Sequence, residues 1–203
     1  MDFRAPLYII VSFALYGALH SLLATRQIKA WVYDRFGGRG QRYYRLIYNL
    51  IGVLTLLPIL ALLAAIPGQQ LYSWAVPWLF LALGLQGIGA LIILVGLLQT
   101  GIWPFFGLGW LFGESQAFND KLIKSGLYGQ MRHPLYTGGL LLLWCMPVMT
   151  TGLLAFNLAA SLYLYIGSVF EEQRLLALFG EEYADYQRRV PRLIPNPWRR
   201  HKS

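Results

Sequence analysis

Hydrophobic residues gather in four long stretches of the chain, at about 6–24, 46–66, 76–98 and 134–170. A helix needs roughly 20 apolar residues to cross about 30 Å of hydrocarbon, so each of the first three predicts one transmembrane helix. The fourth has no charged residue between His133 and Glu171 and is too long for a single crossing. Because Pro147 and the TTG at 150–152 favour a reversal, it predicts two antiparallel helices, about 134–150 and 153–170, joined by a very tight turn.

The pattern changes after the last hydrophobic stretch. Apolar residues now recur every three or four positions, at Leu175, Leu176, Phe179, Tyr183, Tyr186 and Val190. This spacing predicts an amphipathic helix that lies along or under the cytoplasmic surface. The predicted fold is therefore all-α: a single polytopic membrane domain over residues 1–203, with about five transmembrane helices and a cytoplasmic tail over 171–203.

Composition agrees with this pattern. Hydrophobic residues make up 57% of the chain and charged residues 13%, whereas soluble domains carry about 25% charged residues. This excludes a cytosolic enzyme and a disordered chain. The single cysteine, Cys145, lies in an apolar run, and the three histidines are scattered, which argues against a disulfide or a thiolate metal site.

The net charge of +8 would be typical of a nucleic-acid-binding protein if its distribution were even. Sixteen of the 17 basic residues, however, fall on one side of the predicted spans, and Arg4 falls on the other. The positive-inside rule makes that side cytoplasmic, with the N-terminus outside and the C-terminus inside. We therefore expect an integral protein of a prokaryotic inner (plasma) membrane that contacts membrane lipid and no nucleic acid.

Two further features concern the spans and their connections. The loop at 99–133 carries Trp103, Phe105, Phe106, Trp110 and Phe112. These aromatic residues favour an interfacial belt; a half-inserted wall that guards an entrance from the lipid is the alternative. Within the spans, Gly84, Gly87 and Gly89 predict close helix contact, and Gln86 and Asn49 predict polar bonds between helices.

The predicted hairpin brings distant charged residues together. His133 lies about eighteen residues before the turn and Glu171 about twenty after it, so Arg132–His133 should lie beside Glu171–Glu172 at the cytoplasmic surface. Ionisable groups at the margin of hydrocarbon are costly and usually functional. A salt-bridged helix end with a snorkelling arginine is the alternative. Because Tyr128 and Tyr136 fall in the same region, the complete cluster favours a functional site.

Two motifs surround the predicted hairpin. The stretch SGLYGQMRHPLYTGG (125–139) contains G-x-Y-x-x-x-R-H-P-x-Y-x-G, and the stretch EEQRLLALFGEEYADYQRRVPRLIP (171–195) begins with two glutamates and ends in V-P-x-x-x-P. Over about the last 80 residues, the chain resembles the membrane-embedded methyltransferases related to isoprenylcysteine carboxyl methyltransferase and the phospholipid methyltransferases. The stretch HSLLATRQIKAW (20–31) is similar to the methanethiol S-methyltransferase branch.

The resemblance implies that S-adenosylmethionine is the methyl donor. Glu171 or Glu172 would accept from its ammonium, and His133 or Arg132 would pair with its carboxylate. The rings of Tyr128 and Tyr136 would face the sulfonium or the adenine. The cofactor-binding positions expected in this way are Lys124, Gly126, Tyr128, Arg132, His133, Pro134, Tyr136, Gly138, Glu171 and Glu172. Which of the two glutamates makes the closer contact stays open.

The acceptor is less defined. A hydrophobic or membrane-partitioned acceptor, either a small thiol or an isoprenylcysteine carboxylate, is favoured, and a phospholipid amine is an alternative. A thiol reacts as its thiolate, so His20 and Arg132 are the candidate catalytic residues.

A different class of protein is also open. The N-terminal span resembles the membrane domain of zeta-carotene isomerase, and this predicts a haem-binding protein with His20 and His133 as axial ligands. A non-catalytic scaffold or a transporter is a further alternative, although the chain has no internal repeat of the kind that transporters show.

Overall fold

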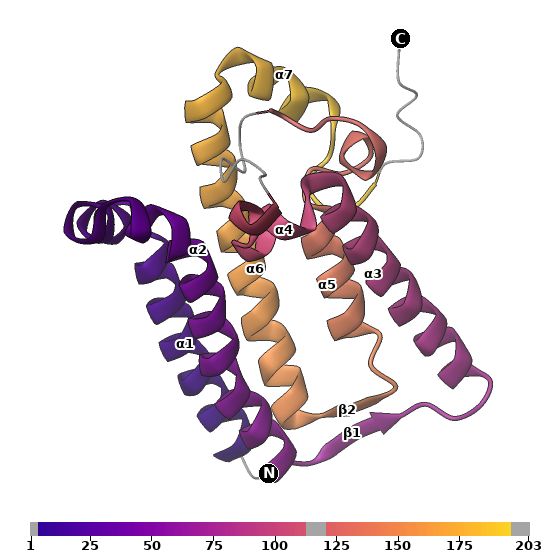
Figure 1. Cartoon of the computed structure of the whole chain (residues 1–203). Coiled ribbons are helices and arrows are strands. Elements are labelled where there is room, and N and C mark those ends of the chain that lie inside the picture. The colour runs from indigo at the N-terminus through magenta and orange to yellow at the C-terminus, as the bar shows by residue number, and fades with distance from the viewer. Residues whose placement is uncertain (1–3, 113–120, 196–203) are drawn as a thin grey trace. The chain divides into compact units, whose positions relative to one another are not determined.

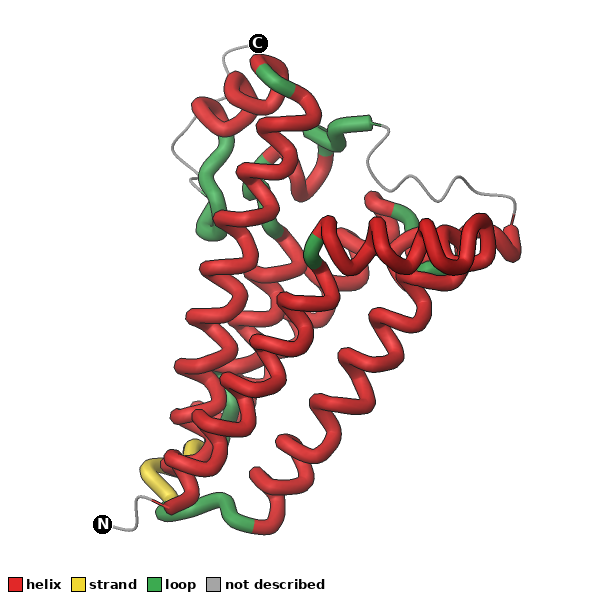
Figure 2. The backbone as a smooth tube through the Cα atoms, turned by 90° about the vertical axis from the view of Figure 1, so that its left-hand side faces the viewer, coloured by secondary structure: helices red, strands yellow, loops and turns green. Residues whose placement is uncertain are grey.

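The computed structural model describes residues 4–112 and 121–195, and most of these are helical (Figure 2). The helices are α1 (Arg4–Ala24), α2 (Arg26–Ala65), α3 (Trp78–Thr100), α4 (Ile102–Phe106), α5 (Pro134–Trp144), α6 (Thr151–Phe179) and α7 (Glu181–Arg189). The strands β1 (Gln70–Ser73) and β2 (Val148–Thr150) pair antiparallel, and two 3-10 turns span Gly109–Phe112 and Gly126–Gly129. The predicted all-α class is confirmed.

Four described helices, α1, α2, α3 and α6, are long and apolar enough to cross a membrane. They coincide with four of the predicted spans. Their outward faces remain hydrophobic; Leu15, Leu98 and Leu162, for example, are 67%, 60% and 59% exposed. A soluble monomer rarely leaves such extensive apolar surface in water, so these faces suit contact with lipid.

The fifth predicted span differs from the structure. Helix α5 has 11 residues, which at 1.5 Å per residue is about half the thickness of the hydrocarbon. Pro147 disfavours helix at the residue before it, and Val148 lies opposite Ser73 in the pairing of β2 with β1. The predicted helix to residue 150 and its very tight turn are therefore wrong, because residues 145–150 form an extended connection.

The chain divides into two compact units. The first contains the described parts of 1–74, 102–118 and 148–163, and the second those of 75–101, 119–147 and 164–203. In the first unit α1 lies beside α2; in the second α3 lies beside α5 (Figure 1).

Close approach of α3 and α5 depends on glycine. A Cβ atom at Gly138 would lie 2.6 Å from the carbonyl oxygen of Gly89, and one at Gly89 would lie 2.9 Å from that of Gly138. Gln86 Nε2 also donates to the Leu142 carbonyl at 3.1 Å. The predictions for Gly89 and Gln86 are confirmed. They are wrong for Gly84 and Gly87, where an added Cβ would meet open space in the described part of the chain.

The segment that links α1 to the second predicted span is itself helical. Thr25 caps the start of α2 by accepting from the Ile28 amide at 3.4 Å. At Gly37 the backbone leaves helical geometry, with φ 54 and ψ −136, and α2 changes direction there. This φ lies in the left-handed region, which glycine adopts without strain.

Part of the aromatic loop is anchored to α2. Arg45 donates to the Pro104 carbonyl at 3.0 Å, and Asn49 donates to the Phe105 carbonyl at 3.1 Å. The guanidinium of Arg42 lies over the Trp110 ring, 5.5 Å from its centroid. Trp103, Phe106 and Phe112 remain 41%, 42% and 56% exposed, which fits the interfacial belt better than a buried role.

The segment after residue 171 forms two helices instead of one. Helix α6 extends to Phe179, and Gly180 at φ 55 separates it from α7. Tyr183 and Tyr186 are buried and pack with Leu122, Leu175 and Phe179. The apolar side of the tail therefore packs on the protein itself. The end of the predicted tail, with Arg199, Arg200 and Lys202, lies outside the described residues.

Candidate active site

The beginning of α5 and the end of α6 meet in the second unit. Pro134 occupies the first turn of α5 and makes His133 its N-cap residue, while α6 carries both glutamates. His133 Nε2 lies 3.0 Å from Glu172 Oε1, and the Tyr136 hydroxyl donates to Glu171 Oε2 at 2.9 Å. The rings of His133 and Tyr136 stack, with centroids 5.1 Å apart. The predicted juxtaposition of these residues is present.

Glu172 is the centre of a buried ionic network. Its side chain is 4% exposed, and Arg132 Nε donates to Oε1 at 2.8 Å. Arg192 Nη2 donates to Oε2 at 2.7 Å, and Gln187 Nε2 donates to the same oxygen at 3.1 Å. With His133 as a fourth partner, both carboxylate oxygens are satisfied within the chain. Glu172 is thus a structural carboxylate.

Arg132 is engaged in the same way. Its side chain is 10% exposed, and Nη1 donates to the carbonyls of Gln187 and Val190 at 3.0 Å and 2.5 Å. The backbone amide of Arg132 donates to the Pro191 carbonyl at 2.9 Å, and that of His133 to the Arg192 carbonyl at 3.1 Å. These bonds fasten the segment after α7 to the beginning of α5.

Glu171 has a different environment. Its side chain is 32% exposed, and its described contacts come from Tyr136 and from His133 Nδ1 at 3.6 Å. The second of these distances is longer than a hydrogen bond. Glu171 therefore keeps accessible carboxylate surface, and His133 Nδ1 is available for a second acceptor.

The electrostatics favour a cation beside these carboxylates. Burial disfavours the charged form of His133, but the hydrogen bonds and charges of Glu171 and Glu172 outweigh it, so the pKa of His133 is raised above 6.5. Burial, assisted by the charge of Glu171, raises the pKa of Tyr128 to about 12, although a hydrogen bond with Thr100 acts in the opposite direction. Tyr128 thus keeps its proton at neutral pH.

The turn before the site is rigid. Gly126 has φ 61, and a Cβ atom there would lie 1.7 Å from Gln99 Nε2. The Leu127 amide donates to Gln99 Oε1 at 3.2 Å, which ties this turn to α3. Lys124 Nζ forms an exposed ion pair with Glu182 Oε1 at 2.6 Å. Gly126 and Lys124 therefore have structural partners of their own.

Pro134 and Gly138 are both buried on α5. Pro134 begins the helix and Gly138 contacts α3, so the structure gives each a packing role.

Sequence reasoning missed Arg192 and Gln187. Both lie at variable positions of the second motif and donate to Glu172. The guanidinium of Arg192 also lies 5.5 Å from the ring centroid of Tyr165. The available signal was the pair of adjacent glutamates itself, since two carboxylates at the edge of hydrocarbon need more donors than Arg132 and His133 provide.

His20 lies in the first unit in an aromatic cluster. Its Nε2 is 2.5 Å from the Tyr48 hydroxyl, and its ring stacks on Tyr16 with centroids 5.5 Å apart. A Cβ atom at Gly52 would lie 2.9 Å from His20 Cε1, so this glycine makes room for the ring. His20 Nδ1 is buried and has no hydrogen-bond partner among the residues that the structure describes.

These features define an integral membrane protein of apolar helices with one buried ionic network at the ends of two of them. The chain belongs to the phospholipid methyltransferase family, whose profile matches residues 77–182. That match covers about half of the chain and includes His133, Tyr136 and both glutamates. The predicted resemblance is confirmed.

Relatives include methanethiol S-methyltransferases. Methanethiol S-methyltransferase 2 of Bradyrhizobium diazoefficiens is 32% identical over 98% of this chain and 77% of its own length. Methanethiol S-methyltransferase 1 of the same organism is 32% identical over 92% of this chain and 65% of its own length. Protein-S-isoprenylcysteine O-methyltransferase B of Arabidopsis thaliana is 31% identical over 38% of this chain and 41% of its own length. No solved structure matches the chain significantly.

Proposed function

We propose that the chain transfers a methyl group from S-adenosylmethionine to a hydrophobic or membrane-partitioned acceptor at the cytoplasmic face of the membrane. A thiol or an isoprenylcysteine carboxylate is the favoured acceptor, because the relatives are named for these two classes. The observation that carries the proposal is the partly exposed carboxylate of Glu171 beside the His133–Tyr136 ring stack.

The residues at this site suit the chemistry of the donor. A carboxylate with accessible surface, Glu171, can accept charge-assisted hydrogen bonds from an ammonium. The second ring nitrogen of a protonated His133 can donate to the carboxylate of the same ligand. The face of an aromatic ring, which Tyr136 and Tyr128 supply, attracts a sulfonium.

The adjacent glutamates are assigned different tasks. Glu171 would contact the donor, since its described partners leave part of the carboxylate accessible. Glu172 would act as a positioning residue that holds His133 and Arg132, since its four partners leave it 4% exposed. Arg132 would act with it, because its guanidinium is engaged by Glu172 and by two backbone carbonyls.

When bound, S-adenosylmethionine supplies an electrophilic methyl carbon on a sulfonium. The task of the protein is then to align an acceptor with that carbon, and alignment alone supplies much of the rate in such displacements. Glu171 and His133 orient the ligand from two sides, and the buried network behind them prevents their movement. The apolar surroundings keep water away from the reacting atoms.

Incubation of the purified protein with labelled donor and three acceptors tests this proposal. The acceptors are methanethiol, an isoprenylcysteine analogue and phosphatidylethanolamine. We expect label on one of the first two, loss of transfer in Glu171→Gln, and unchanged transfer in Glu181→Gln, which removes an exposed charge on α7. Label on phosphatidylethanolamine alone would identify a phospholipid N-methyltransferase instead, and a Soret band without transfer would identify a haem protein.

His20 is proposed as the base for a thiol acceptor, because its Nε2 contacts a hydroxyl and its Nδ1 is buried without a described partner. If so, His20→Gln lowers kcat with a thiol, and the loss is rescued as the pH rises toward the thiol pKa of about 8.5. The same variant should leave kcat with a carboxylate acceptor unchanged, since a carboxylate needs no base. An equal loss with both acceptors, insensitive to pH, would make His20 structural.

A further inference from the structure

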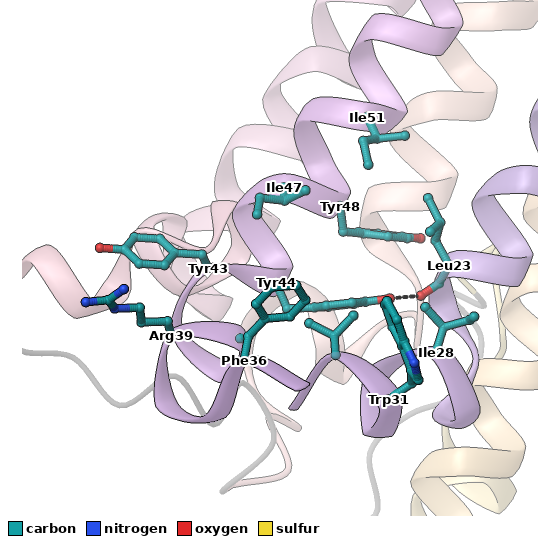
Figure 3. A pocket seen from close by; sticks show the side chains of 12 residues that line it. Leu23, Ile28, Trp31, Phe36, Arg39, Tyr43, Tyr44, Ile47, Tyr48 and Ile51 are labelled. Carbon is teal, nitrogen blue, oxygen red and sulfur yellow. Dashed lines mark hydrogen bonds between the residues drawn. The ribbon is translucent and has the colours of Figure 1, made fainter. Parts of the chain in front are cut away.

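A cavity of about 520 Å³ lies in the first unit between the end of α1 and the beginning of α2 (Figure 3). Pockets that bind small molecules typically measure about 300–1,000 Å³. The bend of α2 at Gly37 shapes the cavity, because lining residues come from both sides of the bend. Phe36 precedes the bend, and Arg39, Tyr43 and Ile47 follow it (Figure 3).

The walls of this cavity are hydrocarbon, although several tyrosines contribute to them. The Tyr44 hydroxyl donates to the Leu23 carbonyl, and the Tyr48 hydroxyl pairs with His20. Their ring faces are therefore left to line the cavity beside Trp31 and Ile47. Water would find few polar partners in such a space, whereas a chain of methylene groups would fit it.

The helical segment before the bend has the pattern of an interfacial helix. Ile28, Trp31, Val32 and Phe36 follow the spacing of one helix face, and all four line the cavity. Trp31 and Phe36 are nevertheless 61% and 56% exposed. An amphipathic helix with exposed aromatic residues lies in the plane where acyl chains meet lipid headgroups.

The charge of this region is strongly positive. Residues 26–45 contain six basic residues and one acidic residue. Arg39 itself lines the cavity and lies at the same end as Phe36 and Tyr43 (Figure 3). A guanidinium at the rim of an apolar cavity suits an anionic group attached to a hydrocarbon chain, and arginine pairs with phosphate through two parallel hydrogen bonds.

We propose that this cavity binds one acyl chain of an anionic glycerophospholipid whose phosphate contacts Arg39. The charge and the interfacial position favour a lipid of the surrounding membrane over a neutral lipid or a methyl acceptor. This lipid would brace the first unit where α1 joins α2. The inference does not depend on the proposed methyl transfer.

Trp31 provides a reporter for the test, because bromine atoms on an acyl chain quench a nearby indole. The Trp31 signal is the difference in fluorescence between the wild-type protein and Trp31→Phe, measured in detergent micelles with added brominated lipid. We expect brominated phosphatidylglycerol to quench this signal at about tenfold lower concentration than brominated phosphatidylcholine, as a charge-assisted contact would give. Equal quenching by the two lipids overturns the proposal.

Three variants, each compared with its own Trp31→Phe double variant, separate the parts of the proposal. Arg39→Gln should abolish the preference for phosphatidylglycerol, whereas Arg26→Gln, an equal loss of charge outside the lining, should keep it. Ile47→Phe should weaken quenching by both lipids because it fills the cavity. Unchanged quenching in Ile47→Phe, or an equal effect of the two arginine variants, contradicts the assignment. Displacement of the lipid by an isoprenylcysteine analogue that the protein then methylates would assign the cavity to the acceptor instead.

Discussion

Two neighbouring carboxylates, Glu171 and Glu172, differ more in their surroundings than in their position along the chain. Glu172 is held by two arginines, a histidine and an amide, whereas Glu171 retains accessible surface. A buried charge with all its partners is stable, but removal of one member leaves the others uncompensated. The first consequences of the site are therefore expected in stability as well as in binding.

Glu172→Gln should destabilise the fold by about 3–5 kcal/mol, because it leaves Arg132 and Arg192 buried without their counter-charge. The matched control is Glu182→Gln, which breaks an exposed pair with Lys124 and should cost about 0–1 kcal/mol. Reversible unfolding in detergent measures both. Equal midpoints for the two variants would mean that the network around Glu172 does not hold the site together.

The protonation of His133 predicts a pH dependence. Its pKa is raised in the folded protein above the value of 6.5, so protonated His133 stabilises the fold fully below about pH 6.5. This contribution is lost as the pH rises through the raised pKa. The difference in unfolding temperature between the wild-type protein and His133→Gln should therefore shrink between about pH 6 and about pH 9. A difference that grows or stays constant over this range would contradict the ionic role of His133.

Most of the cluster could be predicted at the residue scale, because motif spacing and the predicted hairpin bring His133, Tyr136 and the glutamates to one place. The distinct roles of the two glutamates could not. They depend on Arg192 and Gln187, which reach Glu172 only because Gly180 turns the chain and α7 packs through Tyr183 and Tyr186. Such a return is a property of tertiary packing that local spacing does not encode.

Helices α3 and α5 are close neighbours because both carry glycine at their contact. An alanine Cβ at position 138 would lie 2.6 Å from the Gly89 carbonyl oxygen and 2.7 Å from Ile93 Cγ1. Both neighbours belong to α3, so the two helices would have to separate. Since α5 also presents His133 and Tyr136, this separation would disturb the site.

Gly138→Ala should accordingly cost about 1–3 kcal/mol of stability, as overpacking does in other cores. Gly87→Ala is the matched control, since an added Cβ meets open space there and alanine is the better helix former by about 0.5–1 kcal/mol. Thermal unfolding in detergent should lower the midpoint of the first variant and leave or raise that of the second. A lower midpoint for Gly87→Ala alone would contradict the described packing.

At the element scale, hydrophobic length predicted α1, α3, α6 and the second half of α2, because desolvation of about 20 residues is a strong local signal. The end of α5 was predicted six residues too late. The sequence from Cys145 to Thr150 is apolar enough to continue a helix, and only the pairing of β2 with β1 makes it extended. A strand of three residues leaves no periodic pattern to detect.

The whole molecule is oriented by its charge. Sixteen of 17 basic residues are predicted to lie on the cytoplasmic side, which makes the β1–β2 region external and the turn at Gly126–Gly129 internal. Ser73 and Ser125 lie in these two regions, and both are exposed in the structure. They are suitable positions for a test of orientation.

In a Cys145→Ala background, a membrane-impermeant maleimide should label Ser73→Cys on intact cells. It should label Ser125→Cys only after the cells are made permeable. The background protein without cysteine is the control for unspecific labelling. Labelling of Ser125→Cys on intact cells would reverse the predicted orientation and remove the donor site from the cytoplasm.

The central claim is that Glu171, beside His133 and Tyr136, binds the methyl donor. Calorimetric titration of the purified protein with S-adenosylmethionine tests it most directly, with the unfolding temperature of each variant as a check on folding. We predict saturable binding to the wild-type protein and to Glu181→Gln, and a Kd at least about tenfold higher for Glu171→Gln, as expected for a lost charge-assisted hydrogen bond. A folded Glu171→Gln protein that binds the donor with the wild-type Kd would contradict the account.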